Sequence, residues 1–138
     1  MARRRHLSRI AVMQTLFERE RRSGDCQAIL TRNIAELSTE SEPDVAFAET
    51  LMNGILDRED ALREAIQAHA PGWTIERMDP IARCALMIGA FELKFANDAP
   101  PAVVMNECID IAKEYGTDES GKFVNGVLNA MAKGGASS

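Results

Sequence analysis

The 138-residue sequence lacks several patterns that would place it in a common class of proteins. Strand-type alternation of apolar and polar residues is missing and β-branched runs are few, which argues against a β-sheet core. No uncharged apolar run approaches the roughly 20 residues that span a bilayer. No apolar run follows the basic start, as it would in a secretory signal. We therefore expect a cytoplasmic protein, built from helices, with no membrane partner.

Patterns typical of metal, nucleotide and catalytic sites are missing as well. The three cysteines, Cys26, Cys84 and Cys108, form neither a CxxC pair nor a cluster with histidine, which favours buried apolar roles in a reducing compartment. The nine glycines are too dispersed for a phosphate-binding loop. Only His6 and His69 could act as bases near neutral pH, and paired carboxylates lie in polar, solvated segments. We expect no enzyme, no cofactor and no metal site.

Charge is unevenly distributed along the chain, although the net charge is only −5. Residues 1–22 contain seven arginines and no lysine against two glutamates, so this segment carries +5 and the remaining residues carry −10. Arginine pairs with phosphate through two parallel bonds and stacks on bases, which suits RNA. Alternatively, a disordered basic start aids solubility. Charge alone does not decide between these interpretations.

Apolar residues recur at three- and four-residue steps over most of the chain, which predicts an all-α protein of six or seven helices. A capping motif at Ser41 opens a long third helix, which the charged residues 57–60 kink or divide. The helix after Asp79 and Pro80 is apolar on nearly all faces and should lie at the centre of the others. The indole of Trp73, in the connector before it, should plug the side of the core. The predicted segments are a basic N-terminal arm (1–6), one helical domain (7–133) and a frayed tail (134–138).

The last two predicted helices meet at a short polar turn within residues 106–129. Gly116 offers a left-handed position that ends the first of them, and Thr117 can cap the second. Lys122 and Phe123 then lie near a helix N-terminus, where a basic donor and an aromatic ring could both meet a ligand.

Three segments, in order, resemble conserved segments of the NusB family of transcription antitermination factors. The strongest is VVMNECIDIAKEYGTDESGKFVNGVLN (103–129), followed by GAFEL (89–93) and RHLSRIAVMQTLFERE (5–20). The resemblance implies an all-helical fold made of a pair of packed helical bundles. It also implies that the chain pairs with the ribosomal protein NusE to bind boxA RNA, within the RNA polymerase antitermination complex, and thereby supports ribosomal RNA transcription.

The resemblance further implies two sets of contact residues. Those for RNA are Arg3, Arg4, Arg5, His6, Arg9, Lys122 and Phe123. Those for NusE are Phe17 and Glu76. The chain departs from the family at two positions. Relatives have an acidic residue that contacts NusE at the position of Ala82, and an arginine at the position of Met87.

Alternatives stay open for several of these positions. Phe17 and Phe123 also fit the apolar stripes of their helices, and Lys122 could simply face solvent. A second function remains open too. The chain could be a helical adaptor that contacts only proteins and binds an acidic partner through its arginine cluster. Such an adaptor could be a homodimer.

Overall fold

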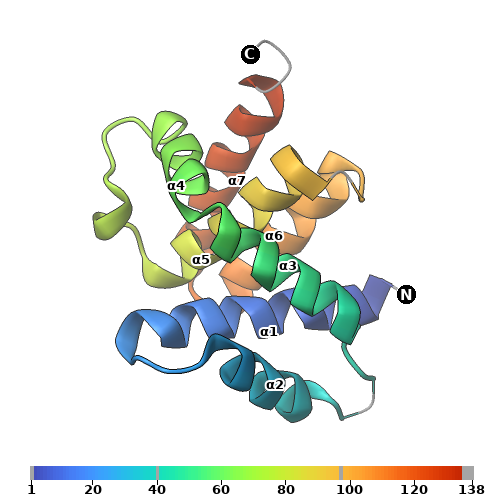
Figure 1. Ribbon diagram of the computed structural model, residues 1–138. Coiled ribbons are helices and arrows are strands. Elements are labelled where there is room, and N and C mark those ends of the chain that lie inside the picture. Colours follow the sequence, from blue (N-terminus) through green and yellow to red (C-terminus); the bar gives the residue numbers. More distant parts are fainter. Residues whose placement is uncertain (1, 40, 97, 135–138) are drawn as a thin grey trace. The chain divides into compact units, whose positions relative to one another are not determined.

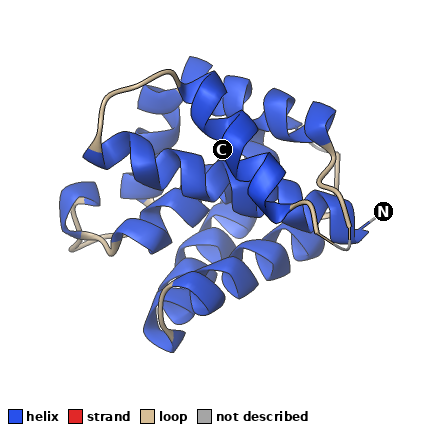
Figure 2. Ribbon diagram, turned by 90° about the horizontal axis from the view of Figure 1, so that it is seen from below, coloured by secondary structure: helices blue, strands red, loops and turns tan. Residues whose placement is uncertain are grey.

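The computed structural model describes residues 2–39, 41–96 and 98–134, and these contain helices and loops but no strand (Figures 1 and 2). This confirms the predicted all-α class. Seven α-helices occur in this part of the chain, with a 3₁₀ turn η1 (Ile75–Arg77) and a π-helical turn η2 (Glu92–Ala96). The α-helices are α1 (Ala2–Arg21), α2 (Cys26–Leu37), α3 (Val45–Asp57), α4 (Glu59–Ala68), α5 (Pro80–Phe91), α6 (Pro101–Tyr115) and α7 (Asp118–Gly134).

The chain divides into two compact units, Met1–Gly54 and Ile55–Ser138, in agreement with the pair of helical bundles that the resemblance implies. Because α1 already begins at Ala2, residues 2–6 of the predicted basic arm are part of the first helix, and Met1 lies outside the described residues. Of the predicted tail, only Gly134, the last residue of α7, falls within the described residues. The extent of the single predicted domain, 7–133, stays a prediction.

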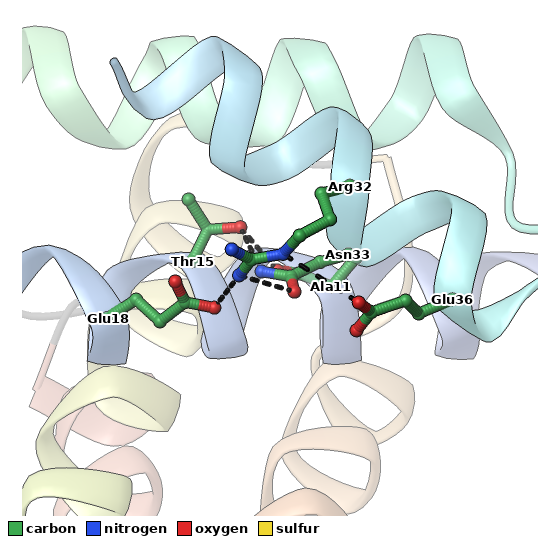
Figure 3. A network of polar contacts seen from close by, with 6 residues as sticks. All are labelled: Ala11, Thr15, Glu18, Arg32, Asn33 and Glu36. Carbon is green, nitrogen blue, oxygen red and sulfur yellow. Dashed lines mark hydrogen bonds and ion pairs between the residues drawn. The ribbon is translucent and has the colours of Figure 1, made fainter. Parts of the chain in front are cut away.

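In the first unit, α1 packs against α2 around a buried polar network (Figure 3). Asn33 Nδ2 donates to Thr15 Oγ1 at 3.1 Å, and the Thr15 hydroxyl donates to the carbonyl of Ala11 at 2.8 Å. Arg32 donates to Asn33 Oδ1 at 3.2 Å and forms an ion pair with Glu18 at the surface. The network satisfies two polar side chains that are nearly inaccessible to water, and thereby fixes the register of the two helices.

The segment before α3 is tied to the first turns of α1. The Ser8 hydroxyl lies 2.8 Å from the Asp44 carbonyl and 3.0 Å from the Arg4 carbonyl, and the Asp44 amide donates to that Arg4 carbonyl at 3.3 Å. Asp44 Oδ1 accepts from the amide of Phe47 at 3.0 Å. The N-cap of α3 is therefore Asp44, and the expectation that Ser41 caps this helix is wrong. An Asp directly before the helix places its carboxylate at the N3 amide, which Ser41 cannot reach from four residues ahead of Val45.

In the second unit, α5 is the central element, as its apolar sequence predicts. It packs against α4, α6 and α7. The charged segment 57–60 does divide the long helix, since α3 ends at Asp57 and α4 begins at Glu59. Asp79 caps α5 by accepting from the Ala82 amide at 3.1 Å, with Pro80 in the first turn. The buried residues of α5 are Ala82, Cys84, Ala85, Leu86, Met87, Ile88, Gly89, Ala90 and Phe91.

The turn between α6 and α7 has the predicted cap but not the predicted glycine geometry. The Ser120 amide donates to Thr117 Oγ1 at 3.1 Å, and the Thr117 amide donates back to Ser120 Oγ at 3.2 Å. Gly116 has a φ of −113°, so it is not left-handed. Glycine is required there for space, because a Cβ would lie 2.7 Å from the Ala112 carbonyl oxygen and 2.8 Å from Ser120 Oγ.

Among the described residues, no helix combines the length and the apolar character needed to cross a membrane.

Candidate nucleic-acid and partner interfaces

The arginines at the start of α1 occupy an ordered helix whose outer side chains face solvent. Arg3 and Arg4 are exposed, and Arg4 Nε donates to the Glu42 carbonyl at 3.2 Å. Arg5 is half-buried, and its guanidinium carbon lies 4.4 Å from the centroid of the Phe47 ring. Because these residues are helical, and because Arg4 contacts the segment before α3 and Arg5 contacts α3 itself, the structure argues against a disordered basic start. A rigid helix turn that presents guanidinium groups is a suitable surface for phosphates.

Arg9 differs from the other arginines of this set because its side chain is buried. It is 2% exposed, and its guanidinium carbon lies 5.0 Å from the centroid of Phe47. Arg5 and Arg9 thus share one aromatic ring, which offsets part of the cost of desolvating Arg9. This buried position indicates that Arg9 packs inside the protein. Its contact with RNA stays a prediction. His6, which lies between Arg5 and Arg9 in the sequence, is half-buried.

The two predicted contacts for a protein partner lie in different units. Phe17, on α1, is half-buried, and the Arg21 guanidinium carbon lies 4.2 Å from its ring centroid. Glu76, in η1, keeps 76% of its side chain exposed and accepts from Arg63 Nη2 at 3.1 Å. Phe17 is therefore only partly buried, and the alternative that it is a fully buried core residue does not hold. An exposed ion pair such as Arg63–Glu76 contributes little to stability, so Glu76 can exchange partners at small cost.

Lys122 and Phe123, in the first turns of α7, face different environments. The Lys122 side chain is 77% exposed, and its Nζ lies 3.5 Å from Glu119 Oε1. Phe123 is half-buried and meets the ring of Trp73 edge-on, with centroids 5.5 Å apart and planes at 66°. Trp73 itself is 46% exposed, so the expectation that its indole plugs the core is wrong. The indole instead packs on Phe123 at the surface, because α7 places that ring beside the connector before α5.

A cavity of about 300 Å³ opens next to this aromatic pair, and sequence reasoning missed it. Asp79 Oδ2, already bonded to the Ala82 amide, also accepts from the Ser120 hydroxyl at 3.0 Å. This contact joins the N-terminus of α5 to that of α7 across 41 residues of sequence. In the sequence, this cavity was indicated only by the two capping residues, Asp79 and Thr117. A capping residue predicts where a helix begins, but it does not predict which other helix end lies next to it. The lining consists of Trp73, Met78, Asp79, Ala82, Thr117, Glu119, Ser120 and Phe123.

A second, more polar hollow of about 280 Å³ surrounds Lys122 between α6 and α7. Its other lining residues include Lys113 and Asn125, both exposed. Lys113 and Lys122 therefore border one concave surface together with Asp118, and Lys113 is a candidate contact that sequence reasoning missed. Within the described ranges, no group of three or more His, Cys, Asp or Glu side chains could hold a metal ion.

The predicted RNA contacts fall into two sets, one in each unit. Residues 3–9 belong to Met1–Gly54, whereas Lys122 and Phe123 belong to Ile55–Ser138. All of these contact assignments stay predictions. Of the two positions where the chain departs from relatives, Ala82 is fully buried in the floor of the cavity and Met87 is 9% exposed.

Comparison with known proteins agrees with the fold and with the sequence motifs. The chain is 33% identical to the transcription antitermination protein NusB of Methylacidiphilum infernorum over 122 residues, which covers 88% of this chain and 85% of that protein. It is 35% identical to the same protein of Bacillus subtilis over 126 residues, covering 91% and 92%. Among solved structures, NusB of T. maritima matches with a TM-score of 0.80 and 36% identity, covering 94% and 90%.

Another similar structure is that of antitermination factors NusB and NusE in complex with dsRNA, with a TM-score of 0.86, 26% identity and coverage of 97% of this chain and 99% of that one. The sequence pattern of the NusB family matches residues 6–133, nearly the whole chain. On this evidence the chain belongs to the NusB family.

Proposed function

We propose that this protein is a cytoplasmic transcription antitermination factor that binds boxA RNA together with NusE. In this role it joins the RNA polymerase antitermination complex and supports ribosomal RNA transcription, and it has no enzymatic activity. The observation that carries the proposal is family membership over residues 6–133, combined with an ordered helix that presents exposed arginines at its start. A similar structure contains NusB, NusE and RNA in one complex.

The charges of the two units suggest where RNA first meets the protein. Met1–Gly54 holds eight arginines, no lysine and eight acidic residues, with most of the arginines in α1. Ile55–Ser138 holds eight basic and thirteen acidic residues, a net charge of −5. RNA is therefore expected to meet the start of α1 first, since local basic clusters attract phosphate even on an acidic protein. The acidic second unit suits a basic protein partner.

The RNA contacts that we assign are Arg3, Arg4, Arg5 and His6 on α1, with Lys122 and Phe123 on α7 and Arg9 in a supporting position. Cationic groups on phosphates and aromatic or guanidinium planes under bases are how single strands are commonly held. Phe17 and Glu76 are the contacts assigned to NusE.

The direct test is the affinity for a boxA-containing RNA, measured with and without NusE over a range of salt concentrations. Each phosphate neutralised on a single strand should add roughly 0.7 to the slope of log K against log salt. We expect a slope corresponding to several phosphates and tighter binding when NusE is present. An RNA with the boxA bases scrambled serves as the matched control. If RNA fails to bind even with NusE present, the proposed function is wrong.

A further inference from the structure

A hollow between the last turns of α1 and the helix α2, called the α1–α2 hollow below, holds an excess of positive charge. It has a volume of about 410 Å³ and lies wholly within Met1–Gly54. Its lining carries three guanidinium groups and two carboxylates, a net charge of +1, and none of the contacts assigned above uses it. The lining residues are Glu18, Arg21, Arg22, Arg32 and Glu36.

Both carboxylates of the α1–α2 hollow pair with the same arginine. Arg32 forms one ion pair with Glu18 and a second with Glu36, whose Oε2 lies 3.8 Å from Arg32 Nε (Figure 3). Among the described residues, no ion pair joins Arg21 or Arg22 to either glutamate. Both of these arginines are exposed, so they supply the charge that the lining leaves uncompensated.

The arginines of the α1–α2 hollow have a geometry that suits a phosphate. The Arg21 guanidinium carbon lies 4.2 Å from the centroid of the Phe17 ring, which orients the group while its N–H edge stays available. That edge pairs with two phosphate oxygens at once, which a lysine cannot do. Lysine would balance the dipole at the end of α1 equally well. Met1–Gly54 nevertheless has eight arginines and no lysine, whereas Ile55–Ser138 has four of each.

The position of the α1–α2 hollow favours RNA over an acidic protein segment. Phe17, on which Arg21 rests, is the contact assigned to NusE, so the hollow adjoins the surface where this partner is expected to dock. A strand that is bound by both proteins has to cross the border between them. The partner is expected to be basic, whereas RNA offers a negative charge at every nucleotide.

We propose that the α1–α2 hollow is a second phosphate site, which binds the RNA backbone outside the segment that meets Arg3 and Arg4. The inference rests on the proposed function, because it extends the RNA surface of the same complex. Arg4 and Arg22 lie near opposite ends of one helix, so roughly 27 Å of helix separates them at about 1.5 Å per residue. This spacing exceeds the Debye length of about 8 Å at physiological salt, so the two ends of α1 hold different phosphates.

Single substitutions test whether the hollow contributes to RNA affinity. Arg21→Gln and Arg22→Gln should each weaken binding of an RNA that contains boxA and its flanking nucleotides. Each should also lower the slope of log K against log salt by up to roughly 0.7. Arg19→Gln is the matched control, because Arg19 is an exposed arginine of the same helix end that does not line the hollow. The control should keep the wild-type slope, and circular dichroism should show the same helix content in all three variants.

Neutral phosphates in the RNA identify the contact itself. When phosphates are replaced one at a time by methylphosphonate, we expect a flanking position at which wild-type protein loses affinity and Arg21→Gln loses nothing further. Such non-additivity is the mark of a direct contact. Arg4→Gln should still lose affinity at that position, because Arg4 holds a different phosphate. If Arg21→Gln remains as sensitive as wild type at every phosphate, the hollow does not hold the RNA backbone and the inference is overturned.

The outcomes separate this inference from the proposed function. If wild-type protein binds no RNA even with NusE present, the proposed function fails and the inference fails with it. If wild-type protein binds RNA and both hollow variants behave as Arg19→Gln does, the inference alone is wrong. If the hollow variants weaken binding of NusE without RNA and leave the salt slope for RNA unchanged, the hollow holds a protein segment, which also contradicts the inference.

Discussion

At the residue scale, Gly89 shows how one missing methyl group allows two helices to approach. A Cβ at Gly89 of α5 would lie 2.7 and 2.8 Å from the two methyl carbons of Leu128 on α7, and 3.3 Å from Cys108 Sγ on α6. Leu128 and Cys108 are both fully buried, so neither side chain can move freely. Glycine at this position therefore lets α5 approach α6 and α7 closely without displacing the Leu128 side chain.

We predict that Gly89→Ala lowers the free energy of unfolding by about 1–2 kcal/mol. Overpacking a well-filled core costs about 1–3 kcal/mol, and the better helix propensity of alanine returns up to about 1 kcal/mol. Gly126→Ala is the matched control, because a Cβ there meets nothing within 4 Å. The control should stabilise the protein by up to about 1 kcal/mol. Urea unfolding of both variants measures the difference. If both variants stabilise the protein equally, the prediction is wrong, and the Leu128 side chain can move to make room for a Cβ at position 89.

At the scale of elements, the first turns of α1 contain arginines of two kinds. Arg3 and Arg4 are exposed, whereas Arg9 is 2% exposed and rests on Phe47. The same residue type therefore has two different roles on one helix. Substituting all the arginines together would mix the loss of RNA contacts with the loss of stability.

We predict that Arg3→Gln with Arg4→Gln weakens RNA binding with little effect on stability. The slope of log K against log salt should fall by roughly 1.4, since each lost phosphate contact removes about 0.7. Arg9→Gln should instead destabilise the protein, because a buried guanidinium that rests on an aromatic ring is replaced by a neutral amide. Salt-dependent RNA binding and urea unfolding together distinguish the two effects. An unchanged slope in the double variant would assign these arginines to solubility alone.

Most helices could be predicted from sequence because their signals are local. The caps at Asp79 and Thr117 and the apolar surface of α5 each depend on a few neighbouring residues, and the structure confirms them. What the sequence could not show depends on contacts between distant segments. Trp73 is exposed because α7 brings Phe123 beside it, and the cavity next to these two rings exists because two helix N-termini meet through Asp79 and Ser120.

Other misses came from competition between nearby signals. Ser41 and Asp44 are both good capping residues, and only the contact of the segment with Ser8 of α1 selects Asp44. At Gly116 the sequence predicted a left-handed residue, whereas glycine is needed there because Ser120 and the Ala112 carbonyl leave no room for a Cβ. The π-helical turn η2 (Glu92–Ala96) could not be predicted, because the spacing of apolar residues did not distinguish it from the α-helix before it.

At the scale of the whole molecule, the candidate RNA contacts are shared between two units. The arginines of α1 belong to one, and Lys122 with the neighbouring Lys113 belongs to the other. If both sets contact a single strand, the second contact becomes intramolecular once the first has formed, which raises the affinity without any new chemistry. A strand too short to reach both sets would gain nothing from the second one.

We therefore predict that the effect of Lys122→Gln depends on RNA length. On a boxA RNA long enough to reach both units, the variant should weaken binding and reduce the salt slope by roughly 0.7. As the RNA is trimmed, the variant and the wild type should converge, because binding then depends on α1 alone. Lys133→Gln, an exposed position in the last turn of α7, is the control and should behave as wild type at every length. A Lys122→Gln effect that persists unchanged on the shortest RNA would mean that the two units hold separate RNA sites. The same outcome would make Phe123 part of an independent contact, because it neighbours Lys122 on α7.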